Sequence, residues 1–288
     1  MTSLYLDRVA ARSAATGTVL CLGLDPDPGS MPDGFPKDLA GLERFATLAL
    51  EAALPFVAAV KPNLAFFEAF GSAGIAVLER LRGRIPADVP VIADAKRGDI
   101  GSTAARQAVA LFDALGADAV TVNPYLGSEA VTPLLERLDR FAYLLCRTSN
   151  PGAGELQDLV VVADTTGGHP AERLHERIAR LASGWGPGQT VGLVVGATAP
   201  DELAKIRSIA PSLAFLVPGV GAQGGTAEPV LAHGPAVVSP LADRPGGGLL
   251  VNVSRGVTGA ATSGAPGDPM ERIATAAEDW ARRLPVLR

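Results

Sequence analysis

Short apolar runs alternate with amphipathic helical segments along the chain, and this alternation limits the possible folds more than any other feature. The runs are apolar throughout, which is typical of strands buried on both faces. Such strands, when separated by helices, form a parallel sheet that helices cover. The predicted strands are Thr18–Leu24, Phe56–Val60, Val91–Ala95, Ala119–Val122, Phe141–Cys146, Val191–Val195, Ala214–Val217 and Leu249–Val253.

Helical patterns precede the first strand and link most of the later ones. Eight strand–helix units within 288 residues favour a closed (β/α)8 TIM barrel with an extra N-terminal helix, as a single domain over residues 1–288. A doubly wound open sheet is the alternative. The predicted helices are Ser3–Ala15, Asp38–Leu54, Ala65–Arg82, Thr103–Leu115 with Ser102 as its N-cap, Glu129–Asp139, Ala171–Ser183, Asp201–Ile209, Thr226–His233 and Pro269–Leu284, and Pro151–His169 is predicted to be a long loop.

Charge and hydropathy exclude several classes of protein. The net charge is −5 and no long basic run occurs, which argues against a nucleic-acid surface. No apolar run is long enough for a membrane span, and Met1–Thr18 lacks the apolar core of a signal peptide. Cys21 and Cys146 lie in apolar runs far apart in the sequence. We expect two buried free thiols in a cytoplasmic protein.

Polar residues follow the ends of most predicted strands, where the active sites of TIM barrels lie. Because side chains alternate along a strand, Asp94 and Lys96 should project from the same side, with Asp99 in the following turn. Lys61 ends the preceding strand. Lysine, unlike arginine, can release a proton near neutral pH, and the chain has only four lysines: Lys37, Lys61, Lys96 and Lys205. We predict a charged catalytic cluster; an ion-pair network that only closes the barrel is the alternative.

A glycine-rich segment, Gly219–Gly225, precedes a short helix and offers backbone N–H groups to an anion. Together with Arg255 at the end of the next strand it predicts a phosphate site. The same glycines and the tract Pro240–Gly248 are candidates for a lid. Asp25 is either a turn residue or part of the site. The histidines lack metal-ligand spacing and are expected at the surface, so we predict no metal site; they are His169, His175 and His233.

The segment Asp94–Thr103 fits the D-x-K-x-x-D-I-x-x-T pattern of the orotidine 5′-phosphate decarboxylase family. The resemblance covers essentially the whole chain and is strongest to the longer bacterial branch of that family. Five further stretches resemble the same family: Gly23–Pro26, Val60–Asn63, Thr148–Pro151, Pro218–Gln223 and Asn252–Gly256.

This resemblance implies decarboxylation of orotidine 5′-monophosphate to uridine 5′-monophosphate, the last step of pyrimidine nucleotide synthesis, without metal or other cofactor. It implies that Lys96 delivers a proton to the ring carbon that loses carbon dioxide, beside Asp94 against the substrate carboxylate. Lys61 would hydrogen-bond to Asp94 and the ribose. Asp99 and Thr103 would reach the site from the other subunit of a homodimer.

The resemblance also implies the remaining substrate contacts. Asp25 would hold a ribose hydroxyl, Ser149 would meet the pyrimidine edge, and Gln223 with Arg255 would bind the phosphate. The roles of three asparagines stay open at this point: Asn63, Asn123 and Asn150.

Two other functions remain as alternatives. A sugar-phosphate decarboxylase or synthase of the same barrel suprafamily would use magnesium, which needs a carboxylate at the end of the second strand. The chain has Lys61 there, a cation that would repel the metal. The other alternative is a catalytically silent nucleotide-binding barrel, against which the intact set of charged residues argues.

Overall fold

The computed structural model describes residues 4–163, 170–262 and 267–287. Its main sheet is 8-stranded and parallel, in the order β2-β1-β10-β9-β8-β5-β4-β3. The edge strands β2 and β3 meet through the bridges Val60–Val91 and Asn63–Asp94. The sheet therefore closes into the predicted TIM barrel, and the open doubly wound sheet is wrong. The strands are β1 (Leu20–Leu24), β2 (Ala59–Pro62), β3 (Ile92–Arg97), β4 (Ala119–Val122), β5 (Phe141–Arg147), β8 (Val191–Val195), β9 (Ala214–Pro218) and β10 (Leu249–Val253).

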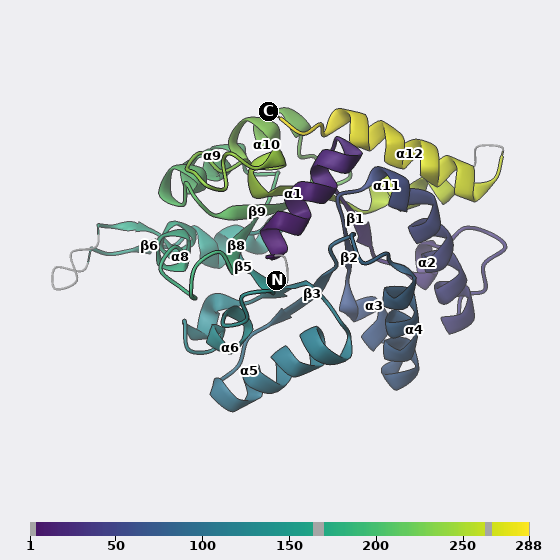
Figure 1. Cartoon of the computed structure of the whole chain (residues 1–288), viewed down its shortest axis with the longest axis horizontal. Helices are drawn as coiled ribbons and strands as arrows, with labels where there is room; N and C mark the ends of the chain where they lie inside the picture. Colours follow the sequence, from purple (N-terminus) through teal and green to yellow (C-terminus); the bar gives the residue numbers. More distant parts are fainter. Residues whose placement is uncertain (1–3, 164–169, 263–266, 288) are drawn as a thin grey trace.

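Helices surround the barrel on its outer side (Figure 1). Most of them follow a strand, as the alternating sequence pattern predicts. They are α1 (Tyr5–Thr16), α2 (Leu39–Ala53), α3 (Leu64–Glu68), α4 (Gly71–Arg84), α5 (Gly101–Ala108), α6 (Thr132–Leu135), α7 (Gly154–Gln157), α8 (Leu174–Ala182), α9 (Pro200–Ile209), α10 (Ala227–His233), α11 (Arg255–Thr258) and α12 (Pro269–Arg283).

Two apolar cores lie on the two faces of the barrel wall. Along β1, Leu20 and Leu22 pack outward against the helices, whereas Cys21 between them packs into the barrel interior. This alternation follows from the period of two along a strand. Cys21 and Cys146 are both buried free cysteines, as predicted.

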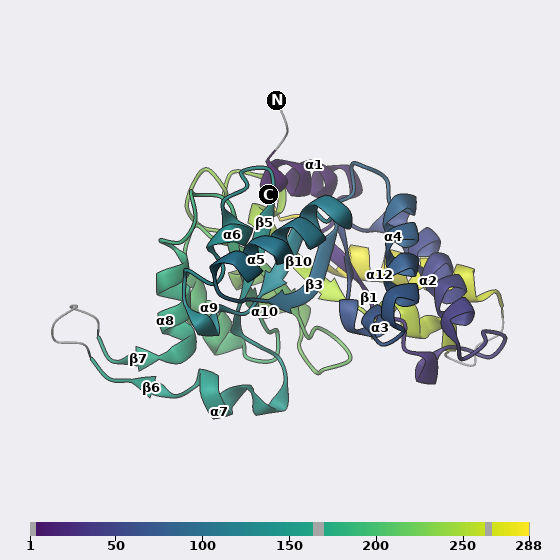
Figure 2. The same ribbon diagram turned by 90° about the horizontal axis from the view of Figure 1, so that it is seen from below.

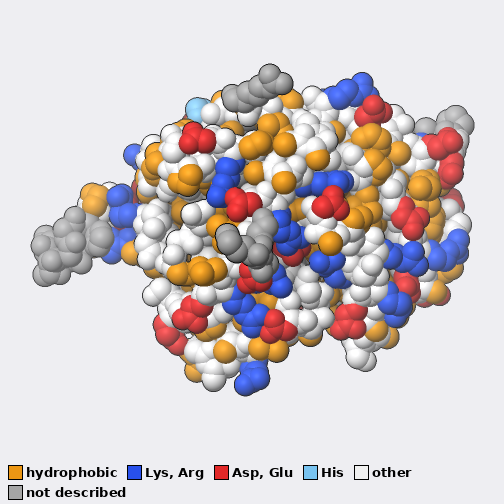
Figure 3. Space-filling model, viewed as in Figure 1, with side chains coloured by type: hydrophobic (Ala, Val, Ile, Leu, Met, Phe, Trp, Pro, Cys, Tyr) orange, Lys and Arg blue, Asp and Glu red, His pale blue; other side chains and the backbone are white. Residues whose placement is uncertain are grey.

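The extra N-terminal helix α1 lies across one end of the barrel (Figure 1). The ring of Tyr5 stacks on Phe141 with centroids 4.8 Å apart, and its hydroxyl lies 3.3 Å from that of Tyr143. Arg8 donates to Asp118 at 2.6 Å. Acidic and basic side chains are interspersed on this face of the molecule (Figure 3). Packing and ion pairing thus hold α1 as a plug at the amino end of the strands.

Some predicted helix boundaries are wrong. The helix predicted to begin after Ser102 begins at Gly101, because Glu129 accepts the Gly101 N–H from outside the helix. The predicted helix Ala65–Arg82 is split between α3 and α4, where Gly71 has a φ of 61°. Of the predicted helix Glu129–Asp139 only α6 forms; Pro133 stands in its first turn, and lacking an N–H, it does not continue a helix from upstream.

The segment predicted as a long loop after β5 contains regular structure. It forms α7 and the strand β6 (Val160–Val161), which pairs antiparallel with β7 (Glu172–Arg173). Figures 1 and 2 both show this hairpin extending away from the barrel. His169 lies outside the described residues. The prediction that His175 is a surface residue is wrong, because its side chain is 1% exposed and its ring contacts the backbone of Gln157.

The tract Pro240–Gly248 is not placed to act as a lid. Its three glycines, Gly246, Gly247 and Gly248, are buried, and a Cβ on Gly246 would lie 2.9 Å from Val19. The tract packs beside α1 and leads directly into the start of β10. It therefore belongs to the amino end of the barrel, opposite to the strand ends that carry the predicted site. No helix in the described part of the chain is long and apolar enough to cross a membrane.

Candidate active site

A cavity of about 780 Å³ opens at the carboxyl ends of the strands. Its floor is apolar and includes Leu145, Val194 and Leu216 from the barrel interior. Its lining brings together residues from all eight strands of the main sheet or the loops that follow them. Seven of the predicted site residues line it: Asp25, Lys61, Asp94, Lys96, Ser149, Gln223 and Arg255.

The charged centre of this cavity is the carboxylate of Asp94. One oxygen accepts from Lys61 Nζ at 2.6 Å, and the other accepts from Lys96 Nζ at 2.6 Å. Lys61 and Asp94 have side chains 6% and 10% exposed, whereas Lys96 is 50% exposed toward the cavity. The arrangement fixes one solvent-accessible ammonium beside a buried ion pair.

The electrostatics favour the charged forms of Asp94 and Lys61. Burial alone would raise the pKa of Asp94, but the ammoniums of Lys61 and Lys96 outweigh it and lower that pKa well below its usual range. Burial alone would lower the pKa of Lys61, but the charges of Asp94 and Asp25 outweigh it and raise that pKa. The anion is thus already balanced by two cations before any ligand binds.

An irregularity in β3 gives the charged pair its orientation. The register of β3 against β4 shifts between Ala93 and Arg97, and Lys96 adopts a left-handed φ of 49°. A non-glycine residue pays about 1 kcal/mol for that conformation. The hydroxyl of Thr121 accepts the backbone N–H groups of Ala95 and Lys96, at 3.1 and 3.0 Å, and donates to Asp94 at 2.8 Å. Thr121 therefore supports the strained strand end.

Thr121 was not among the residues predicted from the sequence. It lies within β4 rather than after it, so a search confined to strand ends passes over it. The available signal is a hydroxyl in the otherwise apolar run Ala119–Val122. A buried hydroxyl needs hydrogen-bond partners, and the strand interior supplies none unless a neighbouring strand is irregular.

Several buried oxygens in and near the cavity lack partners among the described residues. Asp25 Oδ1 and Asn252 Oδ1 line or adjoin the cavity, and Ser254 Oγ lies just past the end of β10. Unpaired buried acceptors are costly, and they are commonly completed by a ligand or by water. These atoms favour a ligand that carries hydroxyl groups at this side of the cavity.

The predicted phosphate end combines the loop after β9 with the end of β10. Gln223 and Arg255 line the cavity there. Within the glycine-rich segment, Gly221 donates its N–H to Gly225 O, and Gly224 donates to Gly221 O. These two amides are committed inside the loop, whereas the side chains of Gln223 and Arg255 line the cavity.

Two predicted site residues do not reach the cavity within one chain. Asp99 lies in the turn after β3, where its Oδ1 accepts the N–H of Ile100 at 2.7 Å. Thr103 lies on an exposed face of α5. Beside them Ile100 is 62% exposed, which is high for a large apolar side chain. The asparagines Asn63 and Asn123, left open above, each cap the short helical turn that follows them.

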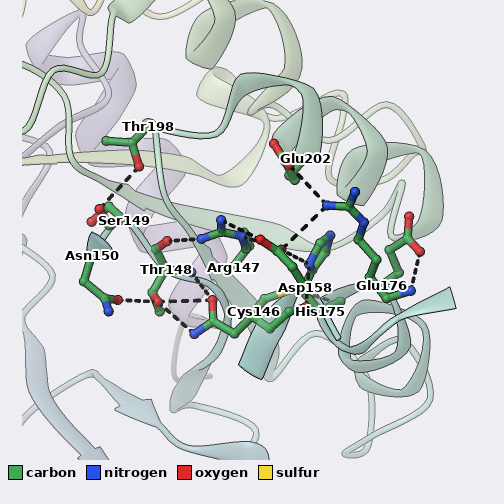
Figure 4. Close-up of polar contacts among 12 residues, drawn as sticks. Cys146, Arg147, Thr148, Ser149, Asn150, Asp158, His175, Glu176, Thr198 and Glu202 are labelled. Carbon is green, nitrogen blue, oxygen red and sulfur yellow. Dashed lines mark hydrogen bonds and ion pairs between the residues drawn. The ribbon is translucent and has the colours of Figure 1, made fainter. Parts of the chain in front are cut away.

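No group of histidine, cysteine and acidic residues in the described part of the chain has the geometry of a metal site. At the end of β5, which β4 separates from β3, the segment Arg147–Asn150 carries a set of side-chain hydrogen bonds (Figure 4). Arg147 pairs with Asp158 at 3.0 Å, and Ser149 accepts through its carbonyl from Thr198. This segment forms the cavity wall after β5.

Comparisons with known proteins agree with this geometry. Residues 18–266 match the family described as "Orotidine 5′-phosphate decarboxylase / HUMPS family". The orotidine 5′-phosphate decarboxylase of Herpetosiphon aurantiacus is 42% identical over 95% of this chain and 96% of its own. The orotidine 5′-phosphate decarboxylase of Roseiflexus castenholzii is 46% identical over 97% of this chain and 94% of its own. The structure of Leishmania donovani OMP decarboxylase has a TM-score of 0.79 at 36% identity and covers 97% of both chains.

Proposed function

The chain belongs to the orotidine 5′-phosphate decarboxylase family, and we propose that its charged network Lys61–Asp94–Lys96 performs the reaction of that family. The reaction converts orotidine 5′-monophosphate into uridine 5′-monophosphate and carbon dioxide. The single observation that carries the proposal is the ammonium of the half-exposed Lys96 side chain. It is held at 2.6 Å from the carboxylate of Asp94 in the cavity.

Lys96 supplies the proton in this proposal. When the bond to carbon dioxide breaks, its electron pair stays on a ring carbon that has no attached electron sink. A fixed ammonium stabilises that charge more than it stabilises the ground state, and this difference raises the rate. The ammonium then transfers a proton to the carbon, which leaves Lys96 as a neutral amine to be reprotonated by solvent.

Asp94 and Lys61 act on Lys96 and on the substrate. Asp94 holds the ammonium of Lys96 in place through the hydrogen bond of 2.6 Å that it accepts. It also stands against the substrate carboxylate, and the repulsion between them is relieved as carbon dioxide leaves. Lys61 balances Asp94 from the buried side and contacts the ribose. Two ammoniums already occupy the oxygens of Asp94, which supports a reaction that uses no divalent metal.

The rest of the cavity binds the nucleotide. The unpaired buried oxygen of Asp25 supports its role as acceptor from a ribose hydroxyl. Ser149 meets the pyrimidine edge, and Gln223 with Arg255 binds the phosphate. Because the phosphate is remote from the bond that breaks, its binding energy can be used to order the charged groups.

A homodimer completes the site in this proposal. Asp99 of the partner subunit would approach Lys96, with Thr103 of the partner subunit near the ribose. The exposed Ile100 beside them supports an apolar contact at that surface. We also propose one domain over the whole chain, working in the cytoplasm, where two free thiols remain reduced.

The test is the ultraviolet absorbance change when purified protein meets orotidine 5′-monophosphate, with and without EDTA. We expect rapid loss of substrate that is indifferent to the chelator. Loss of turnover only with EDTA would make the metal-free mechanism wrong and would favour the magnesium-dependent branch. Tight binding of uridine 5′-monophosphate by folded protein that does not turn substrate over would indicate the silent nucleotide-binding barrel.

A further inference from the structure

A chain of side-chain hydrogen bonds runs along the cavity wall after β5. The N–H of Thr148 donates to Gln157 Oε1 at 2.8 Å, and Gln157 Nε2 donates to the hydroxyl oxygen of Thr148 at 2.8 Å. That hydroxyl lies 2.6 Å from Asn150 Oδ1. All three residues line the cavity. The catalytic network does not use them.

The backbone N–H of Thr148 fixes the order of donors and acceptors in this series of hydrogen bonds. A backbone N–H can only donate, so the Gln157 amide must turn its oxygen toward Thr148 N and its nitrogen toward the Thr148 hydroxyl. The hydroxyl oxygen of Thr148 accepts a hydrogen bond from Gln157 Nε2. The hydroxyl hydrogen of Thr148 is then available for donation to Asn150. The distance of 2.6 Å is typical of O–H···O and short for N–H···O. Asn150 therefore directs its oxygen to Thr148, and its NH2 group is the end that remains for a ligand.

The supports of Gln157 make this arrangement rigid. Asp158, the next residue, holds Arg147 through two hydrogen bonds of 3.0 and 3.1 Å. The buried ring of His175 lies 2.9 Å from the Gln157 carbonyl and 3.3 Å from Asp158 (Figure 4). The end of α7 is thus fixed to the end of β5 on both sides of Gln157. Rigid supports of this kind keep a specificity contact in place.

We propose that Asn150 is a specificity-determining residue that donates its amide N–H to the C4 carbonyl of the pyrimidine, with Thr148 and Gln157 as positioning residues. This rests on the proposed function, which puts ring carbon 6 at Lys96. In the pyrimidine the N3–C4 edge lies away from carbon 6, and in the sheet β4 separates β5 from β3. The C4 carbonyl is an acceptor in uridine nucleotides, whereas cytidine nucleotides carry a donor amino group there.

The decisive variant is Asn150→Asp, which replaces the donor by an acceptor of the same shape. The dissociation constants of uridine 5′-monophosphate and cytidine 5′-monophosphate are measured. The quantity compared is the constant for the cytidine nucleotide divided by the constant for the uridine nucleotide. The added negative charge repels the phosphate of both nucleotides alike, so it cancels in the ratio. We expect the ratio to fall by about 10-fold or more. Equal weakening of both nucleotides would overturn the assignment of Asn150.

A second variant tests the positioning step. Thr148→Val keeps the side-chain volume but removes the hydroxyl that orients Asn150, so we expect the ratio to fall by about threefold or more. Thr16→Val, at the end of α1, is the matched control and should leave the ratio unchanged. An unchanged ratio in Thr148→Val, with a normal thermal melt, would overturn the positioning role. Absence of orotidine 5′-monophosphate turnover by the unaltered protein would instead refute the proposed function.

Discussion

Lys61 and Asp94 form an ion pair of 2.6 Å between neighbouring strands, with both side chains no more than 10% exposed. The pair spans the position where β2 and β3 close the barrel, next to the bridge from Asn63 to Asp94. Because each charge has lost most of its water, removal of one partner leaves the other uncompensated. The same pair therefore serves the fold and the site.

Asp94→Asn should lower the free energy of unfolding by about 3 kcal/mol, since it leaves the buried Lys61 ammonium without its nearest anion. Urea denaturation at neutral pH measures this as a lower midpoint with an unchanged slope. The double variant Lys61→Met with Asp94→Asn should regain part of the loss, because it removes both buried charges. A loss below about 0.5 kcal/mol would mean that the pair behaves like an exposed one.

The stability difference between the unaltered protein and Asp94→Asn should depend on pH. The pKa of Asp94 is lowered in the folded state, so its contribution is complete above its unfolded pKa of about 3.9 and disappears as the pH falls below that value. The pKa of Lys61 is raised, so its contribution persists up to its unfolded pKa of about 10.4 and is lost above that. Denaturation of both proteins from pH 2 to 8 should give curves that converge on the acid side. Parallel curves would contradict this linkage.

Lys96→Ala should abolish decarboxylation while it leaves binding of uridine 5′-monophosphate within about threefold, because phosphate and ring contacts come from other strands. Stopped turnover with retained binding, measured by absorbance and calorimetry, is the expected pair of results. Lys205→Ala, at a lysine on α9 far in sequence from the site, is the control for loss of a lysine as such. Near-normal turnover by Lys96→Ala would refute the proton-donor role.

Mixing inactive Asp99→Ala with inactive Lys96→Ala subunits should restore activity. In a mixed dimer one of the two composite sites keeps both residues, so recovery of about a quarter of the normal rate is expected at equal mixing. Subunit exchange must be demonstrated in parallel by mass spectrometry. Continued inactivity despite exchange would show that Asp99 does not act across the interface.

Trp280 should support the phosphate end of the site from outside the cavity. Its Nε1 donates to Gly256 O at 3.1 Å, and a Cβ on Gly221 would lie 3.0 Å from its ring. The indole thus lies against the glycine-rich segment that carries Gln223 and against α11, which begins at Arg255. Trp280→Leu should lower kcat/KM for orotidine 5′-monophosphate by about tenfold.

Binding of uridine, which lacks phosphate, should be unchanged in Trp280→Leu. The matched control is Trp185→Phe, at the chain's other tryptophan, which should have normal kinetics. Equal weakening of uridine and its 5′-monophosphate would point to a general loss of packing instead.

Residues at strand ends could be predicted from the sequence, because in a parallel barrel all strands deliver their last residues to one rim. Lys61, Asp94, Lys96, Ser149, Gln223 and Arg255 were placed in this way or by family resemblance, and all line the cavity. Thr121 could not be found so, since its role depends on a register shift in the neighbouring strand. Nor could the burial of His175, which depends on how α7 and α8 pack over β5.

The sequence by itself determined the class of the fold, because buried strands and amphipathic helices are periodic features of local sequence. It also indicated that Lys61, Asp94 and Lys96 meet at the ends of neighbouring strands. Only the tertiary structure decided that Pro240–Gly248 lies at the amino end beside α1, that Asp99 and Thr103 do not line their own cavity, and which way the amide of Asn150 points. Those outcomes depend on contacts between segments far apart in the chain, which no local pattern encodes.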